Sequence, residues 1–222
     1  MLVEEMRHRW AELAKQVSPH AYAVRTAFET LRALYSQPAR YYHTFEHVLS
    51  CLKLLDEHHV LVNDPWVVEF SIWVHDAIYV PGESDNELCS AHLGGAMLTM
   101  LDRSDVQQDM FDIVLATRHH VLSAHQHHHK NTDANVVADI DLAILGSDRR
   151  VYQTYTYGIL QEYRQIAGAG LYSARLDFLK EMLSRPHLFK TPTFREKFEA
   201  KARENMTAES EYLGKSVKNY ES

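Results

Sequence analysis

Apolar residues recur along most of the chain at the three- and four-residue spacing of helices, and not in the strict alternation of half-buried strands. Glycine and proline are scarce, at 8 and 6 of 222 residues, and no Asn-Gly or Asp-Gly pair marks a hairpin turn. The pattern therefore predicts an all-α fold. We expect helices over residues 2–17, 19–37, 44–57, 65–76, 84–101, 104–120, 148–167, 171–184 and 193–207. A further short helix is expected to contain Asp139 and Asp141 and to end at Gly146.

Short sequence signals set the starts of several of these helices. Ser18-Pro19 is typical of an N-cap residue followed by proline in the first turn. Asn63-Asp64-Pro65 opens the segment 65–76, which is apolar almost all round, as in a buried central helix. Ser84 with Glu87 three residues later fits a capping box.

No internal repeat and no shift of composition divides the chain. We therefore expect residues 1–222 to form one helical bundle domain, of which 210–222 are a frayed end. Residues 121–134 are polar without a period and predict a loop. A hydrophobic fraction of 45% and a charged fraction of 24% are ordinary for a globular fold.

Charge and cysteine content narrow the class of protein. The net charge of −7 argues against a general nucleic-acid-binding face. Cys51 and Cys89 are too few for a disulfide framework or a thiolate zinc site, which fits a reducing compartment. No secretory signal is visible, and no stretch approaches the roughly 18 apolar residues of a membrane span. We expect a cytoplasmic protein without a membrane partner, and homo-oligomerisation is left open.

The doublet His75-Asp76 stands at the end of the apolar segment 65–76. A carboxylate in such surroundings costs several kcal/mol unless it is paired or binds a metal. The alternative is a histidine at a helix C-terminus beside an aspartate that bonds a neighbouring backbone group.

Two further groups supply imidazoles and carboxylates. His43 and His47 are four residues apart, so in a helix they share one face, about 6 Å between Cβ atoms; the alternative is a pair of surface histidines. Asp139 and Asp141 interrupt a second apolar segment, where Asp139 suits an N-cap and Asp141 is the better ligand candidate. Two histidines and two aspartates without a thiolate would suit Mn, Fe, Co, Ni, Zn or Mg.

Taken in chain order, the three segments resemble the HD-domain superfamily of metal-dependent phosphohydrolases. The H…HD…D pattern of that superfamily is met by His47, His75, Asp76 and Asp141. The chain is most similar to a group of uncharacterised bacterial predicted HD phosphohydrolases. The resemblance covers about residues 35–206 and implies an all-α bundle with the site in its middle. The matching phrases are 40–48, 75–79, 86–87, 90–91, 117–120, 139–146, 162–163 and 202–205. Relatives often carry arginine at the position of Gln161, which puts a substrate role of that helix in doubt.

The resemblance implies a role for each matched residue. His47, His75, Asp76 and Asp141 would bind a divalent metal ion that lowers the pKa of water and stabilises charge on a phosphoryl group. Tyr42 to His47 is similar to a segment of cyclic-nucleotide phosphodiesterases, in which the first histidine is a general acid. His43 would therefore protonate the leaving oxygen, and Asp76 would help to take the proton of the attacking water.

Other residues are candidates with ordinary alternatives. Glu87 would orient a water or ligand, although the capping box explains it equally well. His120 is the candidate for a second metal, and Arg40 and Arg118 for the substrate phosphate. The run His125 to His129 is more typical of a solvated loop than of a metal site.

The leading hypothesis is therefore hydrolysis of a nucleotide or another small phosphate ester. A di-iron oxygenase on the same scaffold is the second, with Glu87 and His120 as the nearest additional ligands. The third is a regulatory module that senses a nucleotide without turnover.

Overall fold

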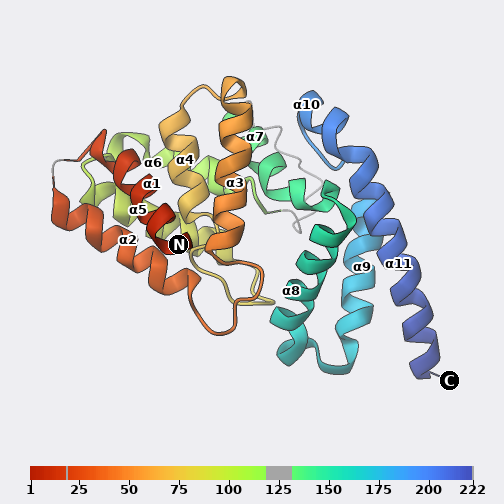
Figure 1. Cartoon of the computed structure of the whole chain (residues 1–222). Helices are drawn as coiled ribbons and strands as arrows, with labels where there is room; N and C mark the ends of the chain where they lie inside the picture. The colour runs from red at the N-terminus through yellow and green to blue at the C-terminus, as the bar shows by residue number, and fades with distance from the viewer. Residues whose placement is uncertain (19, 119–131, 222) are drawn as a thin grey trace. The chain divides into compact units, whose positions relative to one another are not determined.

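The computed structural model describes residues 1–18, 20–118 and 132–221, without the side chains of 169 and 216–221 (Figure 1). Within these ranges the regular elements are helices and no strand occurs, so the all-α prediction is confirmed for them. None of the described helices has the length and apolar character needed to cross a membrane. The chain divides into two compact units, Met1–Ile140 and Asp141–Ser222.

Unit 1 is built around a buried helix that was expected from its sequence. The helices of this unit are α1 (Leu2–Lys15), α2 (Ala21–Tyr35), α3 (Phe45–His58), α4 (Pro65–Val74), α5 (Asn86–Met100), α6 (Gln107–Leu115) and most of α7 (Thr132–Leu142). Helix α4 packs against α1, α3, α5 and α6. Its N-cap Asp64 accepts a hydrogen bond from the Val67 amide at 3.1 Å, and Pro65 occupies the first turn, as expected.

An aromatic cluster fixes α4 against its neighbours. The Trp73 ring contacts that of Trp10 in α1 at 5.3 Å and that of Phe45 in α3 at 6.0 Å between ring centres, in edge-to-face geometry. Phe45 also lies 5.3 Å from Tyr35 of α2, whose hydroxyl donates to the Trp73 carbonyl at 3.1 Å. The C-terminal end of α4, which carries His75 and Asp76, is therefore held by close packing.

Two of the expected caps are wrong. Helix α2 begins at Ala21 with His20 at its N-cap, because the Ser18 hydroxyl accepts from the His20 amide at 3.3 Å instead of capping the helix. Helix α5 begins at Asn86 with Asp85 at its N-cap, and no side chain caps it.

The expected loop at residues 121–134 is partly wrong, and its remaining residues lie outside the described ranges. Helix α7 already begins at Thr132. Asp133 anchors this start to the beginning of α4, since its carboxylate accepts from the amides of Asn63 and Asp64 at 2.7 and 3.0 Å. Asp139 is fully buried within α7, so the expected N-cap role is wrong.

Unit 2 contains α8 (Arg149–Ala167), α9 (Leu171–Ser184), the short α10 (Pro192–Phe194) and α11 (Ala200–Glu221). Helix α11 packs on α9 and on a 3₁₀ turn at Ala143–Gly146. The Asn205 side chain of α11 donates to the carbonyls of Leu145 and Ser147, both at 2.9 Å. The turn is thereby fixed to the helix.

Helix α11 continues well beyond residue 207, where the helix was expected to end. Leu213 is 2% exposed, and Glu209 belongs to a buried ion pair with Arg175 of α9 at 2.9 Å. Tyr152 and Thr156 of α8 also donate to the Glu209 carboxylate. These tertiary contacts stabilise the continuation of a polar sequence as a helix.

Candidate metal centre

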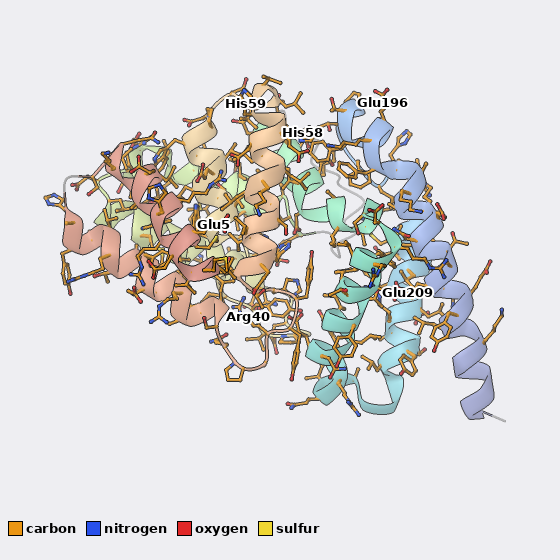
Figure 2. All side chains as sticks on the ribbon, in the orientation of Figure 1. Glu5, Arg40, His58, His59, Glu196 and Glu209 are labelled. Atoms are coloured by element: carbon orange, nitrogen blue, oxygen red, sulfur yellow. The ribbon has the colours of Figure 1, made fainter. Side chains whose placement is uncertain are left out.

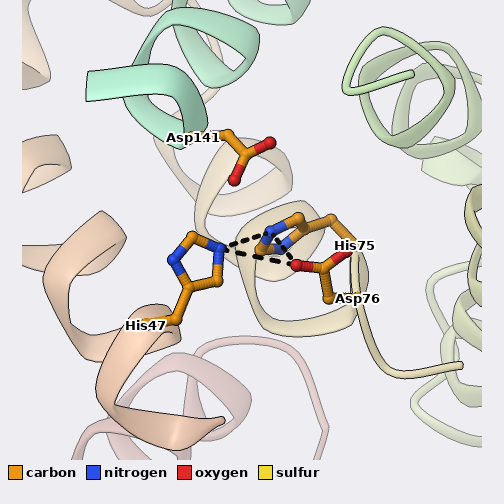
Figure 3. A group of neighbouring side chains, drawn as sticks. All are labelled: His47, His75, Asp76 and Asp141. Atoms are coloured by element: carbon orange, nitrogen blue, oxygen red, sulfur yellow. Dashed lines mark hydrogen bonds and ion pairs between the residues drawn. The ribbon is translucent and has the colours of Figure 1, made fainter. Parts of the chain in front are cut away.

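Four side chains expected from the sequence come together at the end of α4. His47 of α3, His75 and Asp76 after α4, and Asp141 near the end of α7 each offer one ligand atom, and these atoms lie within 4.8 Å of one another. Figure 3 shows the four side chains directed towards one another. Such a group could hold a metal ion.

Asp141 is the first residue of unit 2, but it stands on the same helix as the last residues of unit 1. The boundary falls between Ile140 and Asp141, inside α7. The helical backbone of α7 therefore fixes Asp141 to the residues that precede it.

The His75 ring is oriented by a backbone carbonyl. Its Nδ1 lies 2.8 Å from the Ile72 oxygen, which can only accept, so Nδ1 carries a proton. In the neutral ring the Nε2 atom then has a lone pair and no proton. This arrangement, in which one ring nitrogen donates to a carbonyl and the other is left to coordinate, is typical of histidines that bind metals.

The His75 Nε2 atom faces the Asp76 carboxylate and the His47 ring. It lies 3.1 Å from the Asp76 Oδ2 atom and 3.2 Å from the His47 Nε2 atom, and the latter two atoms are 3.5 Å apart. Two acceptors at 3.1 Å need a positive charge between them, either a proton that makes His75 cationic or a metal ion. Ligand atoms around an ion with bonds of about 2.0–2.1 Å are separated by about 3 Å in octahedral and about 3.3 Å in tetrahedral geometry. The observed separations therefore fit a metal ion.

The centre is largely shielded from water. His47 and His75 are 5% and 2% exposed, and the Asp76 side chain is 14% exposed. Burial alone would raise the pKa of the Asp76 carboxyl. The charges of His75 and His43, together with hydrogen bonds from His47 and His75, instead hold this pKa well below its usual range. Asp76 is therefore a carboxylate at neutral pH.

His43 lies beside the centre but is not one of the four grouped residues. Its ring is 6.0 Å from that of His47 and packs against the Tyr79 ring at 4.0 Å between ring centres. The Tyr42 ring contacts both histidines. Its centre lies 5.0 Å from that of the His43 ring and 4.8 Å from that of the His47 ring. Tyr42 and Tyr79 were not predicted as site residues, although both lie within the segments that carry the resemblance.

The loop that follows Asp76 is tied down by two polar side chains that sequence reasoning left without a role. The Ser90 hydroxyl accepts from the Ile78 amide at 3.0 Å and donates to the Ile78 carbonyl at 3.1 Å. The Asn86 side chain makes the same pair of bonds with Val80, both at 2.9 Å. The resemblance included both residues, but only the fold shows that they hold this loop.

Glu87 was a candidate to orient a water or ligand, and Arg118 to contact the substrate phosphate. The two side chains form an ion pair with each other. The Arg118 Nε atom is 3.5 Å from the Glu87 Oε2 atom, and the two side chains are 26% and 12% exposed. The capping box proposed for Glu87 is wrong because no side chain caps α5. With a cationic partner in contact, Glu87 is a weaker candidate for a second metal ligand. His120 and the run His125 to His129 lie outside the described residues.

Arg40 is 7% exposed, and its guanidinium donates to backbone carbonyls at the centre. These contacts favour a structural role over the expected contact with a substrate phosphate.

Comparisons of the chain with protein-family models, with curated proteins and with solved structures find no match. The geometry of the centre is therefore the basis for a functional proposal.

Proposed function

We propose that the chain is a metal-dependent phosphohydrolase of the HD type, and that it hydrolyses a nucleotide or another small phosphate ester. The observation that carries the proposal is the position of the His75 Nε2 atom, which lies 3.1 Å from the Asp76 carboxylate and 3.2 Å from the His47 Nε2 atom. His47, His75, Asp76 and Asp141 would hold one ion. Their nitrogen and oxygen atoms suit Mn, Fe, Co, Ni or Zn, and Mg is also compatible with the carboxylates.

A divalent ion in this centre supplies a water of lowered pKa and neutralises charge on a phosphoryl group. The Asp76 carboxylate would hold the ion and help to take the proton of the attacking water. His43, held against Tyr79 beside the centre, is positioned to donate a proton to the leaving oxygen. The low exposure of His47 and His75 strengthens electrostatic interactions in the centre.

The test is a screen of nucleotides and other phosphate esters with Mn²⁺, in which released phosphate is measured. We expect turnover by the wild-type chain and its loss in His75→Ala and in Asp76→Ala. His58→Ala is a matched control, because His58 is also buried and also has its Nδ1 atom 2.8 Å from a backbone carbonyl, that of Leu54. Full activity in both centre variants would contradict the proposal.

A His43→Ala variant separates the proton donor from the metal ligands. We expect it to retain the bound ion and to lose most turnover of substrates with a poor leaving group. Substrates with an acidic leaving group need less protonation, so their turnover should fall less.

A further inference from the structure

The Arg40 guanidinium donates hydrogen bonds to backbone carbonyls in two segments that border the centre. Its Nη1 atom donates to the His43 carbonyl at 3.1 Å and to the Asp76 carbonyl at 2.6 Å. Its Nη2 atom donates to the Ala77 carbonyl at 2.7 Å, and its Nε atom to the Gln37 side chain at 3.3 Å. Arg40 is labelled in Figure 2. One side chain thus contacts the segment before α3 and the segment after α4.

The same guanidinium also lies against the aromatic residues that flank the centre. It is 5.1 Å from the Tyr35 ring centre and 5.6 Å from that of Tyr79. Tyr79 in turn packs against the His43 ring at 4.0 Å. Arg40 therefore contacts His43 directly through its carbonyl and indirectly through Tyr79.

The position suits an arginine for two physical reasons. Asp76 and Ala77 follow the end of α4, where carbonyls lack helical partners and a positive charge is favourable. A planar fork of donors can satisfy several carbonyls in fixed directions, which a lysine ammonium cannot reproduce. Because Arg40 is 7% exposed, these bonds compete little with water.

We propose that Arg40 is a positioning residue, which sets the distance between the histidine segment and the His75-Asp76 doublet by binding the His43, Asp76 and Ala77 carbonyls together. The inference rests on the proposed function, because it concerns the same centre. It assigns Arg40 no contact with the substrate or with the ion.

The test uses Co²⁺, whose visible absorption reports the coordination geometry without any substrate. Arg40→Lys keeps the positive charge but loses the planar set of guanidinium donors. Arg40→Ala removes both the charge and the donors. Changes next to metal ligands commonly weaken metal binding by about 10- to 100-fold, and we expect this range for both variants, with an altered Co²⁺ spectrum. Millimolar guanidinium should restore the spectrum and affinity of Arg40→Ala but not those of Arg40→Lys, whose side chain fills the site.

Arg203 supplies the control. It donates to the carbonyls of Leu183, Arg185 and Pro186 in unit 2, so its loss also leaves backbone carbonyls without a cationic donor. Arg203→Lys should lower stability and leave the Co²⁺ spectrum unchanged. If Arg40→Ala does not fold, the metal affinity and the Co²⁺ spectrum of Arg40→Lys test the positioning role.

A wild-type spectrum and affinity in folded Arg40→Lys would overturn the positioning role, as would an Arg203→Lys spectrum altered to the same extent. A wild-type chain that binds Co²⁺ and hydrolyses no ester would instead overturn the proposed function, and the Arg40 comparison would still stand.

Discussion

His75 and Asp76 place a ring nitrogen and a carboxylate oxygen 3.1 Å apart in a largely buried environment. Without a positive charge between them this arrangement is unfavourable, because water is too scarce to screen two acceptors. The hydrogen bond to the Ile72 carbonyl orients the His75 ring, and the close packing of Trp73 holds the end of α4. The cluster to which these two side chains belong could therefore hold a metal ion.

Asp139 and Asp141 are two residues apart in α7, so their side chains point in directions about 200° apart. Only Asp141 belongs to the group of potential ligands. We predict that Asp141→Asn weakens metal binding at least about 10-fold. Asp139→Asn, of the same shape, should retain the ion. Isothermal titration with Mn²⁺ or Zn²⁺ measures both affinities, and the reverse order would show that Asp139 is the ligand.

The sequence predicted which side chains could form the centre, but not how they are held. The apolar surroundings of the carboxylates made them candidates, and the resemblance to the HD-domain superfamily selected His47, His75, Asp76 and Asp141 as one set. The role of Arg40 could not be predicted in this way, because a long flexible side chain can reach either a substrate or a carbonyl. Its contacts depend on how two loops approach each other in space.

Gly146 shows how a single residue allows two elements of unit 2 to approach closely. A Cβ atom at this position would lie 2.7 Å from the Phe198 carbonyl oxygen and 2.8 Å from the Phe198 Cβ atom. Since the obstacle includes backbone, the turn at Ala143–Gly146 would have to move away from the segment that contains Phe198.

We therefore predict that Gly146→Ala lowers the free energy of unfolding by about 1–3 kcal/mol, as overpacking typically does. Gly214 in α11 is the control, because a Cβ atom there would meet nothing within 4 Å. Gly214→Ala should be neutral or stabilising by up to about 1 kcal/mol. Urea denaturation measures both, and equal effects of the two substitutions would contradict the packing argument.

The buried ends of α8, α9 and α11 make the stability of unit 2 sensitive to alkali. Burial raises the pKa of Tyr152 and of Tyr155, so the folded chain keeps both phenols protonated. In the unfolded chain these phenols ionise near pH 10. Their contribution to stability is complete below this pH and is lost as the pH rises towards the folded pKa values.

We predict that unfolding by urea becomes easier above about pH 10, and that Tyr155→Phe has a shallower dependence on pH. Phenolate absorbance supplies the second readout. The buried tyrosines should ionise together with unfolding, and reversible ionisation of both in the folded chain would contradict the prediction.

Helical periodicity predicted most elements because it reports which face is buried. Helix α9 has the expected bounds, and α4 is buried on nearly all sides as expected. Caps and ends were less predictable, since a polar side chain can bond elsewhere in the fold. Asn86 binds the loop at Val80, and Glu209 extends α11 by pairing with Arg175.

The chain forms two compact units, although its composition shows no boundary. The division falls within α7, inside a segment that reads as one helix, so the sequence offers no signal for it. The expected single HD-type domain stays a prediction.

Metal binding should stabilise the whole fold if it is restricted to the native state. An ion at 100 times its dissociation constant adds about 2.7 kcal/mol to the free energy of unfolding. We predict this increase for wild-type chain with Mn²⁺ or Co²⁺, and its reversal by a chelator. His75→Ala should show no increase. An equal shift in this variant would place the stabilising ion elsewhere.

The most direct measurement is elemental analysis of the purified chain after dialysis, beside His75→Ala and the His58→Ala control. Four potential ligand atoms within 4.8 Å of one another could hold one ion. We predict one divalent transition-metal ion per chain in wild type and His58→Ala, and none in His75→Ala. A wild-type chain that retains no ion after incubation with Mn²⁺, Fe²⁺, Co²⁺, Ni²⁺ or Zn²⁺, or a His75→Ala chain with undiminished metal content, would contradict the assignment of this centre.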